Sequence, residues 1–307
     1  MIKFLNKVAL FFALMAFIDV ICGFSFKYLR EHAIGGETQK NYYIAEKCCD
    51  DILVLGSSRA ARHYDSKVIE DSFGLTCYNC GEPGCGIITA YARYKMIEQR
   101  HKPKIVVYEV SPNYDYFRTD DYSKYLGRIR QYSDNPEVKK LNIELGDAFE
   151  RVRLFSNMYR NNSFLIHNMI DNFLETNYYN GFEPLYGTLK KDAPKKSSIS
   201  LDYAIDSLKL SYMEKLIVDL KMNGISVFFV ASPKFISSEE AINSSSEYSP
   251  VFALCEQYDV PFLYHTYLEG VSNNRELFQD YVHLNEKGAK SFTEYICSEL
   301  KDNLPVE

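Results

Sequence analysis

The sequence lacks any excess of positive charge and any long run of like charge. Its 307 residues include 35 Lys and Arg against 41 Asp and Glu, which gives a formal net charge of −6 at pH 7. Nucleic-acid-binding proteins concentrate Lys and Arg against the phosphate backbone, so this balance argues against a nucleic-acid partner. With 46% hydrophobic and 25% charged residues, the composition fits one globular domain of ordinary soluble composition plus an accessory segment.

Histidines are few, and none lies close in sequence to the main group of cysteines. A zinc site is therefore disfavoured, and we expect no metal and no cofactor. The pair Cys77-x-x-Cys80 lies in a predicted strand rather than at a helix start, which makes it a poor redox motif. We expect most cysteines to be small buried apolar groups, although one or two disulfides can form in an oxidising compartment. The eight cysteines are Cys22, Cys48, Cys49, Cys77, Cys80, Cys85, Cys255 and Cys297.

A cleavage signal is lacking after the apolar run near the N-terminus. Val8–Phe26 is nineteen residues long and apolar except for Asp19 and Ser25, which is long enough to cross a bilayer as a helix. No Ala-x-Ala pattern follows it, and no small residue precedes Cys22, so neither a cleaved signal nor a lipoprotein anchor is favoured. We expect residues 1–27 to be an uncleaved signal-anchor that holds a catalytic domain outside the cytoplasm.

Asp19 is the unusual residue of this predicted span. A carboxylate inside a membrane usually faces protein rather than lipid, so Asp19 indicates a partner within the membrane. The alternative is a protonated or snorkelling side chain in an ordinary anchor. Beyond the anchor, residues 28–47 are polar and are predicted to form a linker.

Residues 48–307 alternate short apolar runs with helical stretches. This alternation predicts a parallel sheet that is covered by helices on both faces. A stretch at about 115–200, rich in Tyr, Asn and Phe, interrupts the pattern and is expected to be a mainly helical insertion. The predicted strands are Ile52–Leu55, Cys77–Asn79, Ile105–Tyr108, Val227–Val230 and Phe262–Tyr264.

Two adjacent serines follow the first predicted strand. The strand is closed by Gly56, so Ser57 and Ser58 lie at its carboxyl end, where a helix begins. Backbone N–H groups at such a helix start can stabilise an oxyanion, which makes Ser58 a candidate nucleophile. The alternatives are that Ser58 is only a helix N-cap, or that Ser57 is the nucleophile if the turn is read one residue off.

A candidate base and its orienting carboxylate lie near the C-terminus. Asp280 and His283 are three residues apart, so a single turn brings both side chains to one side. The carboxylate can then hold the imidazole in the tautomer that accepts a serine proton. The alternatives are that Asp280 is only a turn residue and that His283 is a capping or surface histidine. His265, at a strand end, is a weaker candidate for the base, and His63 is expected on the surface.

The order and spacing of these segments resemble the SGNH (GDSL-type) hydrolase superfamily, with four sequence blocks matched across roughly residues 50–295. The family's usual Gly-Asp-Ser is Gly56-Ser57-Ser58 here, so the nucleophile maps to Ser58. The third block departs most, because Ser111-Pro112-Asn113-Tyr114 stands in place of Gly-x-Asn-Asp. The remaining family positions map to Gly84, Asn113, Asp280 and His283.

The resemblance implies a flavodoxin-like three-layer α/β/α sandwich with the site at the carboxyl ends of its strands. It also implies an oxyanion hole formed by the Ser58 amide, Gly84 and Asn113. Arg59 is by default a solvated helix charge, or it holds an anionic substrate group at the mouth of the site.

The function implied is that of a serine esterase or O-acyltransferase acting on acyl esters of envelope glycans or lipids. The layout is similar to that of membrane-anchored members of the superfamily, such as the protein that completes D-alanylation of teichoic acid and the alginate acetylation proteins. Those members work beside a membrane-bound O-acyltransferase, which would give Asp19 a partner. The alternative is a non-catalytic anchored scaffold or glycan-binding protein on the same fold.

Overall fold

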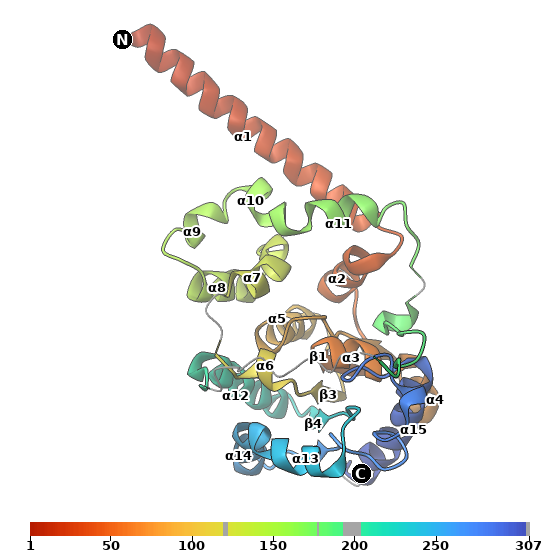
Figure 1. Cartoon of the computed structure of the whole chain (residues 1–307). Helices are drawn as coiled ribbons and strands as arrows, with labels where there is room; N and C mark the ends of the chain where they lie inside the picture. The colour runs from red at the N-terminus through yellow and green to blue at the C-terminus, as the bar shows by residue number, and fades with distance from the viewer. Residues whose placement is uncertain (119–121, 177, 193–203, 305–307) are drawn as a thin grey trace. The chain divides into compact units, whose positions relative to one another are not determined.

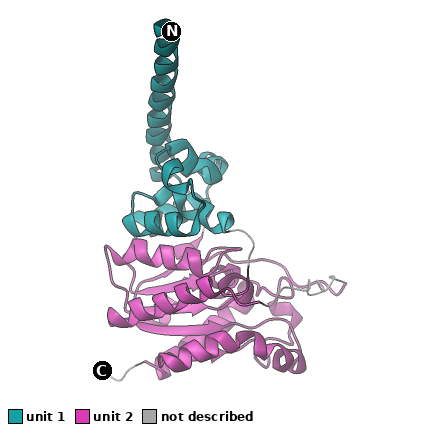
Figure 2. Ribbon diagram, turned by 90° about the vertical axis from the view of Figure 1, so that its left-hand side faces the viewer, with its two compact units in different colours: residues 1–47, 121–177 teal, residues 48–120, 178–307 magenta. Residues whose placement is uncertain are grey.

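The computed structural model describes residues 1–118, 122–176, 178–192 and 204–304. The chain divides into two compact units (Figure 2): unit 1 contains residues 1–47 and 121–177, and unit 2 contains residues 48–120 and 178–307. The end of the predicted insertion, residues 193–200, lies outside the described residues.

Unit 2 is built on a parallel sheet of five strands in the order β2-β1-β3-β4-β5. Strand β1 pairs with β2 through Ile52 and Cys77 and with β3 through Ile52 and Ile105, while Phe229 of β4 pairs with Phe262 of β5. This strand order is that of flavodoxin-like folds, and it confirms the predicted fold class. The strands are β1 Ile52–Gly56, β2 Cys77–Asn79, β3 Ile105–Glu109, β4 Ser226–Ala231 and β5 Phe262–Tyr264.

Helices cover both faces of the sheet, so that alternate strand residues enter two separate cores (Figure 1). Ile52, Val54, Val107 and Phe228 belong to a cluster of buried apolar side chains that also includes Phe292 of α15. Their neighbours along the strands are buried as well, which explains why the predicted strands read as continuous apolar runs. On one face α15 (Glu286–Asp302) packs with α3 (Ser58–His63) and α4 (Ser66–Phe73), and on the other α5 (Ile87–Glu98) packs with α12 (Ser207–Met222).

Unit 1 is helical throughout its regular structure as described. Its first helix, α1 (Ile2–Glu31), has a mean hydropathy of 2.3 in its most apolar window and is long and apolar enough to cross a membrane by length and composition. The segment predicted as a linker, residues 28–47, contains the end of α1 and all of α2. The other helices of the unit are α2 Gly36–Glu46, α7 Ser123–Ile129, α8 Pro136–Leu145, α9 Glu150–Arg153, α10 Asn157–Asn161 and α11 Leu165–Ile170.

The cysteines are free thiols, and six of the eight are buried. Cys77, for example, lies inside β2 and is fully buried, and burial raises the pKa of its thiol well above the usual value. An apolar environment that disfavours the thiolate also makes a thiol unreactive. These cysteines therefore pack as small apolar side chains, as expected for most of them.

Candidate active site

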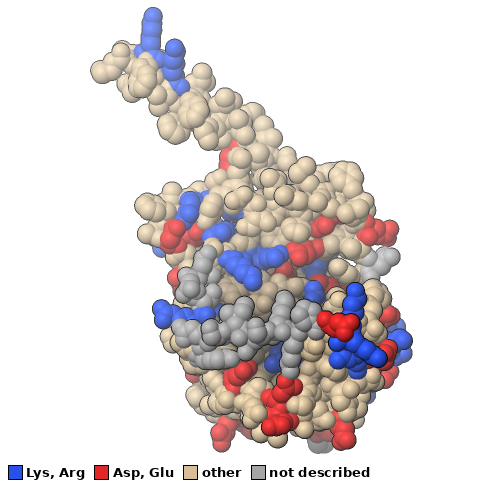
Figure 3. All heavy atoms as spheres, viewed as in Figure 1, with Lys and Arg blue, Asp and Glu red and all other residues tan. Residues whose placement is uncertain are grey.

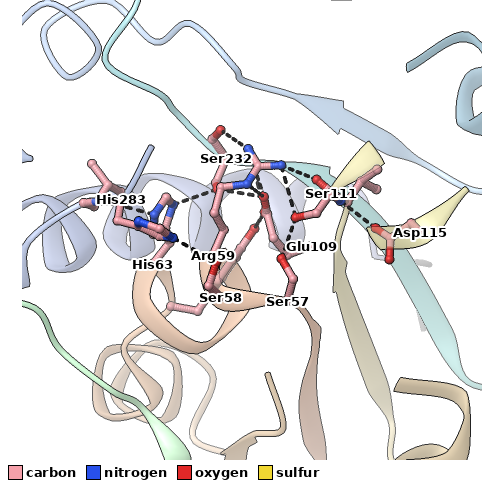
Figure 4. A network of polar contacts seen from close by, with 12 residues as sticks. Ser57, Ser58, Arg59, His63, Glu109, Ser111, Asp115, Ser232 and His283 are labelled. Carbon is pink, nitrogen blue, oxygen red and sulfur yellow. Dashed lines mark hydrogen bonds and ion pairs between the residues drawn. The ribbon is translucent and has the colours of Figure 1, made fainter. Parts of the chain in front are cut away.

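Polar side chains gather at the carboxyl ends of three neighbouring strands in unit 2 (Figure 4). Ser57 and Ser58 follow β1, Glu109 and Ser111 lie at the end of β3, and Ser232 follows β4. Parallel strands deliver their carboxyl ends to a single edge of the sheet, where ligands bind in open α/β folds. The fold thus assembles a polar centre from segments far apart in the sequence.

A sharp turn at Gly56 joins β1 to the helix that carries Ser58. Gly56 has φ +134, and a Cβ added there would lie 2.5 Å from the carbonyl oxygen of Glu109. Any side chain would therefore clash with β3, and only glycine adopts this backbone conformation without strain. The turn explains why the apolar strand stops at Gly56 and why α3 begins at once with Ser58.

Ser58, His283 and Asp280 form a continuous chain of hydrogen bonds. Ser58 Oγ lies 2.8 Å from His283 Nε2, and His283 Nδ1 lies 2.8 Å from Asp280 Oδ2. The second carboxylate oxygen of Asp280 accepts the backbone N–H groups of Val282 and His283 at 2.7 and 2.8 Å. The structure therefore brings together the three residues that sequence reasoning proposed as nucleophile, base and orienting carboxylate.

The environment of Asp280 favours its ionised form. Partial burial by itself raises the pKa of this carboxyl, but the hydrogen bond from His283, the charge of His283 and the two backbone amides lower it to about 2. An ionised Asp280 accepts a hydrogen bond from the N–H at Nδ1 of His283, so Nε2 keeps a lone pair toward Ser58. In this tautomer His283 can accept the serine proton.

Ser57, the alternative nucleophile, has a different partner. Its side chain is buried, and its Oγ lies 2.6 Å from Ser111 Oγ. The backbone N–H of Ser111 in turn donates to Asp115 at 2.5 Å. Ser57 therefore joins the ends of β1 and β3, whereas Ser58 points toward the histidine.

The two other oxyanion candidates, Gly84 and Asn113, lie in a turn and in a short helix, respectively. Gly84 has φ +73 within a turn that the Cys85 N–H closes on the Glu82 carbonyl at 3.1 Å, and Glu82 N–H donates to the Gly56 carbonyl at 3.0 Å. This turn is thereby tied to the end of β1. Asn113 is exposed in α6 (Pro112–Asp115), directly after β3. Both stay predicted members of an oxyanion hole.

Arg59 does not lie at the mouth of the site, where we expected a substrate-binding role. Its side chain is buried, and its Nε lies 3.2 Å from Glu109 Oε1. The guanidinium also donates to the carbonyl oxygens of Val110 and Ser232. The charge is therefore used inside the protein, because a buried guanidinium requires a carboxylate and carbonyl partners.

His63 is buried, contrary to the surface position that we expected. Leu284 N–H donates to His63 Nε2 at 3.0 Å, so the proton of the neutral ring sits on Nδ1, which lies 2.7 Å from Ser232 Oγ. Burial, reinforced by the nearby charges of His283 and Arg59, lowers the pKa of His63 well below its usual value. Because Leu284 follows His283 directly, this neutral ring positions the loop that carries the candidate base.

Glu109 is the hub of the buried network. Its carboxylate accepts the hydroxyl of Tyr64 and both the N–H and the Oγ–H of Ser232, and it pairs with Arg59. Burial raises the pKa of Glu109, while Arg59, Tyr64 and Ser232 act in the opposite direction. Sequence reasoning missed this residue, although a glutamate that ends an apolar strand in the sequence Ile-Val-Val-Tyr-Glu is a usable signal of a buried ionic contact.

Glu109→Gln is expected to lower the free energy of unfolding by about 3–5 kcal/mol, because it leaves the Arg59 guanidinium buried without a counter-charge. Urea unfolding of the purified variant measures this effect. The double variant Arg59→Met/Glu109→Leu removes both charges and is expected to recover much of the loss. A Glu109→Gln variant that is as stable as the parent chain would contradict the role of Glu109 as a hub.

His265, the weaker candidate for the base, has a partner outside this centre. Its Nε2 lies 2.5 Å from Glu299 of α15. Within the described ranges, no three His, Cys, Asp or Glu side chains are grouped so as to hold a metal ion.

No protein-family model and no curated protein sequence matches this chain. Among solved structures, it is similar to TesA, with 12% identity, 82% of this chain and 99% of that chain covered, and a TM-score of 0.44. It is also similar to a putative acylhydrolase from Bacteroides fragilis (12% identity, 86% and 97% covered, TM-score 0.41) and to the acetyl xylan esterase AlAXEase (11%, 83% and 100%, 0.41). Similarities of this size carry no argument about the chemistry of the chain.

Proposed function

We propose that the protein is a membrane-anchored serine esterase or O-acyltransferase that uses Ser58, His283 and Asp280. The observation that carries the proposal is the pair of 2.8 Å hydrogen bonds that joins the three side chains in this order. An activated serine requires a base within hydrogen-bond reach and a third group that orients the base. The strand-end position of Ser58 supports the same conclusion, because it presents the hydroxyl at the edge of the sheet where ligands bind.

In the proposed acylation step, Ser58 Oγ forms a bond to the ester carbonyl carbon while its proton passes to His283 Nε2. Asp280 stays ionised, because its pKa is about 2, and it stabilises the imidazolium that forms. The negative charge on the former carbonyl oxygen is stabilised by the backbone N–H of Ser58, by Gly84 and by Asn113. Collapse of the intermediate then expels the alcohol, which takes the proton from His283.

The acyl-enzyme is resolved by the reverse sequence of proton transfers. His283 removes a proton from an incoming hydroxyl, which attacks the acyl carbon and releases Ser58. Water as the acceptor makes the protein an esterase, and a sugar hydroxyl makes it an O-acyltransferase. The apolar helix α1 supports a position at the outer face of a membrane, and acyl esters of envelope glycans or lipids are the proposed substrates, with a membrane-bound O-acyltransferase as the proposed partner.

The direct test is covalent labelling with a fluorophosphonate, whose phosphorus forms a bond to an activated serine oxygen while fluoride leaves. We expect one adduct on the full-length protein, located by mass spectrometry on the peptide that contains Ser58. The labelling rate is expected to fall sharply in His283→Ala, because the serine loses the group that takes its proton. An adduct on Ser57 would show that Ser57, and not Ser58, is the nucleophile.

Labelling also separates the enzyme from its alternative. A non-catalytic scaffold or glycan-binding protein has no need of an activated serine and would give no adduct. Ser57→Ala is the matched control, since it removes a neighbouring hydroxyl that bonds to Ser111 rather than to the histidine. That variant is expected to label at the rate of the parent chain.

A further inference from the structure

The last helix of unit 1 has its polar and apolar sides reversed relative to a helix of a soluble domain. In α11 and the turn after it, Asn168 and Asp171 are buried, whereas Ile166 is 68% exposed and Phe173 is 82% exposed. Asp171 accepts the backbone N–H of Thr38 at 2.9 Å, so the polar side is used against α2. A surface helix in water presents the opposite arrangement, with its apolar stripe facing the core.

The segment around α9 shows the same reversal. Glu150 is 1% exposed and its carboxylate accepts Arg130 Nε at 2.8 Å and Tyr159 OH at 2.7 Å. Phe149 and Phe155, on either side of it, are 71% and 77% exposed. An ionised pair is therefore held inside while phenylalanines point outward. Burying charge and exposing large aromatic rings is unfavourable in water, but it suits a surface that contacts an apolar medium.

Exposed apolar side chains recur along this whole segment of unit 1, and we name them together the α9–α11 face. Exposed contiguous apolar surfaces of this kind mark sites of contact with proteins or membranes. Its members are Phe149, Val152, Phe155, Met158, Leu165, Ile166, Met169, Ile170, Phe173 and Leu174, each more than 40% exposed.

Helix α1 is joined to this face through Asp19. The carboxylate of Asp19 accepts Ser156 Oγ at 2.7 Å and the backbone N–H groups of Asn157 and Met158 at 2.8 and 3.0 Å, which are the first N–H groups of α10. One turn further along α1, a Cβ added to Gly23 would lie 2.7 Å from the Asn157 side chain, so α10 lies closely against α1 there. Asp19 thus has hydrogen-bond donors within its own chain, whereas the expected partner within the membrane stays a prediction.

The position of Asp19 sets the length of α1 that is left to cross a bilayer. Residues 2–18 precede it and span about 25 Å at 1.5 Å per residue, which is close to the hydrocarbon thickness of about 30 Å. Figure 1 shows α9, α10 and α11 along the edge of unit 1 from which α1 projects, and in Figure 3 the part of that edge next to α1 has few charged side chains, whereas charged side chains lie at its α9 end. The apolar face and the apolar helix are therefore continuous.

We propose that the α9–α11 face lies in the interfacial layer of the bilayer that α1 crosses, so that unit 1 is seated on lipid and Asp19 marks the depth of the membrane surface. This inference rests on the proposed anchoring by α1, but not on the proposed catalytic chemistry. It moves the predicted span toward the N-terminus, from Val8–Phe26 to about residues 2–18. Lys3 and Lys7 then lie toward the opposite surface, which their long side chains can reach by snorkelling.

Tryptophan fluorescence tests the proposal, because the chain contains no tryptophan of its own. Full-length Phe155→Trp and Phe173→Trp are reconstituted, separately, into phosphatidylcholine vesicles with and without brominated acyl chains. We expect bromine to quench the emission of both variants by about twofold or more, since a face buried in the interface reaches the upper acyl chains. Both side chains are more than three-quarters exposed in the unit, so these replacements are expected to disturb its packing little; the tryptophan ring at position 155 can also keep the contact of Phe155 with Lys139 Nζ, which lies 5.7 Å from the ring centroid.

Two control variants make each outcome decisive. Met222→Trp, at the end of α12 in unit 2, replaces an apolar side chain that is 82% exposed and is expected to show no quenching. Phe11→Trp, within α1, is expected to be quenched strongly. If Phe11→Trp is quenched while Phe155→Trp and Phe173→Trp are not, the face does not contact lipid and a protein partner is the remaining occupant. If Phe11→Trp is not quenched, α1 does not cross the bilayer, and the proposal fails. The proposed catalytic chemistry is not affected by that result, because fluorophosphonate labelling tests it independently.

Asp19→Ala tests the connection between α1 and the face. In the Phe155→Trp background it removes the acceptor of the first N–H groups of α10, and we expect less quenching at position 155. In the Phe11→Trp background the quenching is expected to stay the same, because residues 2–18 still cross the bilayer. Equal quenching at position 155 with and without Asp19 would show that the carboxylate does not hold the face at the membrane.

Discussion

Ser58→Ala is expected to lower kcat/KM for a small soluble ester such as p-nitrophenyl acetate by about 10⁴-fold or more, because the atom that forms the bond to the acyl group is removed. Ser58 is only partly buried, and its hydroxyl contacts His283. The variant is therefore expected to unfold at nearly the same urea concentration as the parent chain. The measurement is the rate of p-nitrophenolate release at pH 7, together with a urea unfolding curve.

Ser57→Ala is the matched control for this prediction. Its hydroxyl bonds to Ser111 at 2.6 Å, so its loss is expected to cost about 1 kcal/mol of stability and to leave kcat/KM within a few-fold of the parent value. The reverse result, with Ser57→Ala inactive and Ser58→Ala active, would place the nucleophile at Ser57. Full activity in both variants would remove the proposed serine chemistry altogether.

Asp280→Asn is expected to lower kcat by about 10⁴-fold while the fold is retained. The asparagine amide can donate a hydrogen bond to an unprotonated His283 Nδ1, and the neutral ring then carries its N–H at Nε2, toward Ser58. In this tautomer the ring no longer accepts the serine proton. The rate of p-nitrophenolate release by Asp280→Asn measures the effect, and Asp65→Asn, which alters a helix-capping carboxylate on α4, is the matched control with unchanged activity.

The same substitution has a signature in the dependence of stability on pH. The pKa of Asp280 is lowered in the folded protein from 3.8 to about 2, so its ionised form contributes stability above about pH 4, and this contribution is lost as the pH falls toward 2. In Asp280→Asn this part of the acid-induced loss of stability is expected to be absent. Unfolding midpoints measured between pH 5 and 2 for the two proteins test this, and identical curves would contradict the hydrogen-bonded environment of Asp280.

The sheet and the three site residues could be predicted from the sequence because each depends on a local pattern. Short apolar runs closed by glycine predict buried parallel strands, and the order β2-β1-β3-β4-β5 agrees with the fold that the sequence blocks imply. The sequence signal for Ser58 is its position after a predicted strand, and the signal for Asp280 and His283 is their spacing of three residues. The meeting of Ser58 with His283 follows once the sheet order is known, because both segments end at the same edge.

The buried network around Glu109 was decided by the tertiary structure. Arg59 and His63 both lie on α3, and their positions along the chain do not show which side of this short helix faces the sheet. The packing of α3 against β1 and α15 turns both side chains inward. They are accommodated because β3 ends in Glu109 and Ser232 follows β4, and these two residues supply the carboxylate, hydroxyl and carbonyl partners that a buried guanidinium and imidazole need.

By itself, the sequence determined that the chain has an α/β domain and an apolar N-terminal helix, and it singled out the serine, histidine and carboxylate that hydrogen bonds join in the structure. The sequence showed that Asp19 is a carboxylate within an apolar run, but it did not show which groups bind that carboxylate. Only the tertiary structure brings Asp19 to the first N–H groups of α10 and turns Phe149, Phe155 and Phe173 outward. The physical reason is that a helical pattern specifies two opposite sides, whereas the neighbours of the helix decide which side is buried.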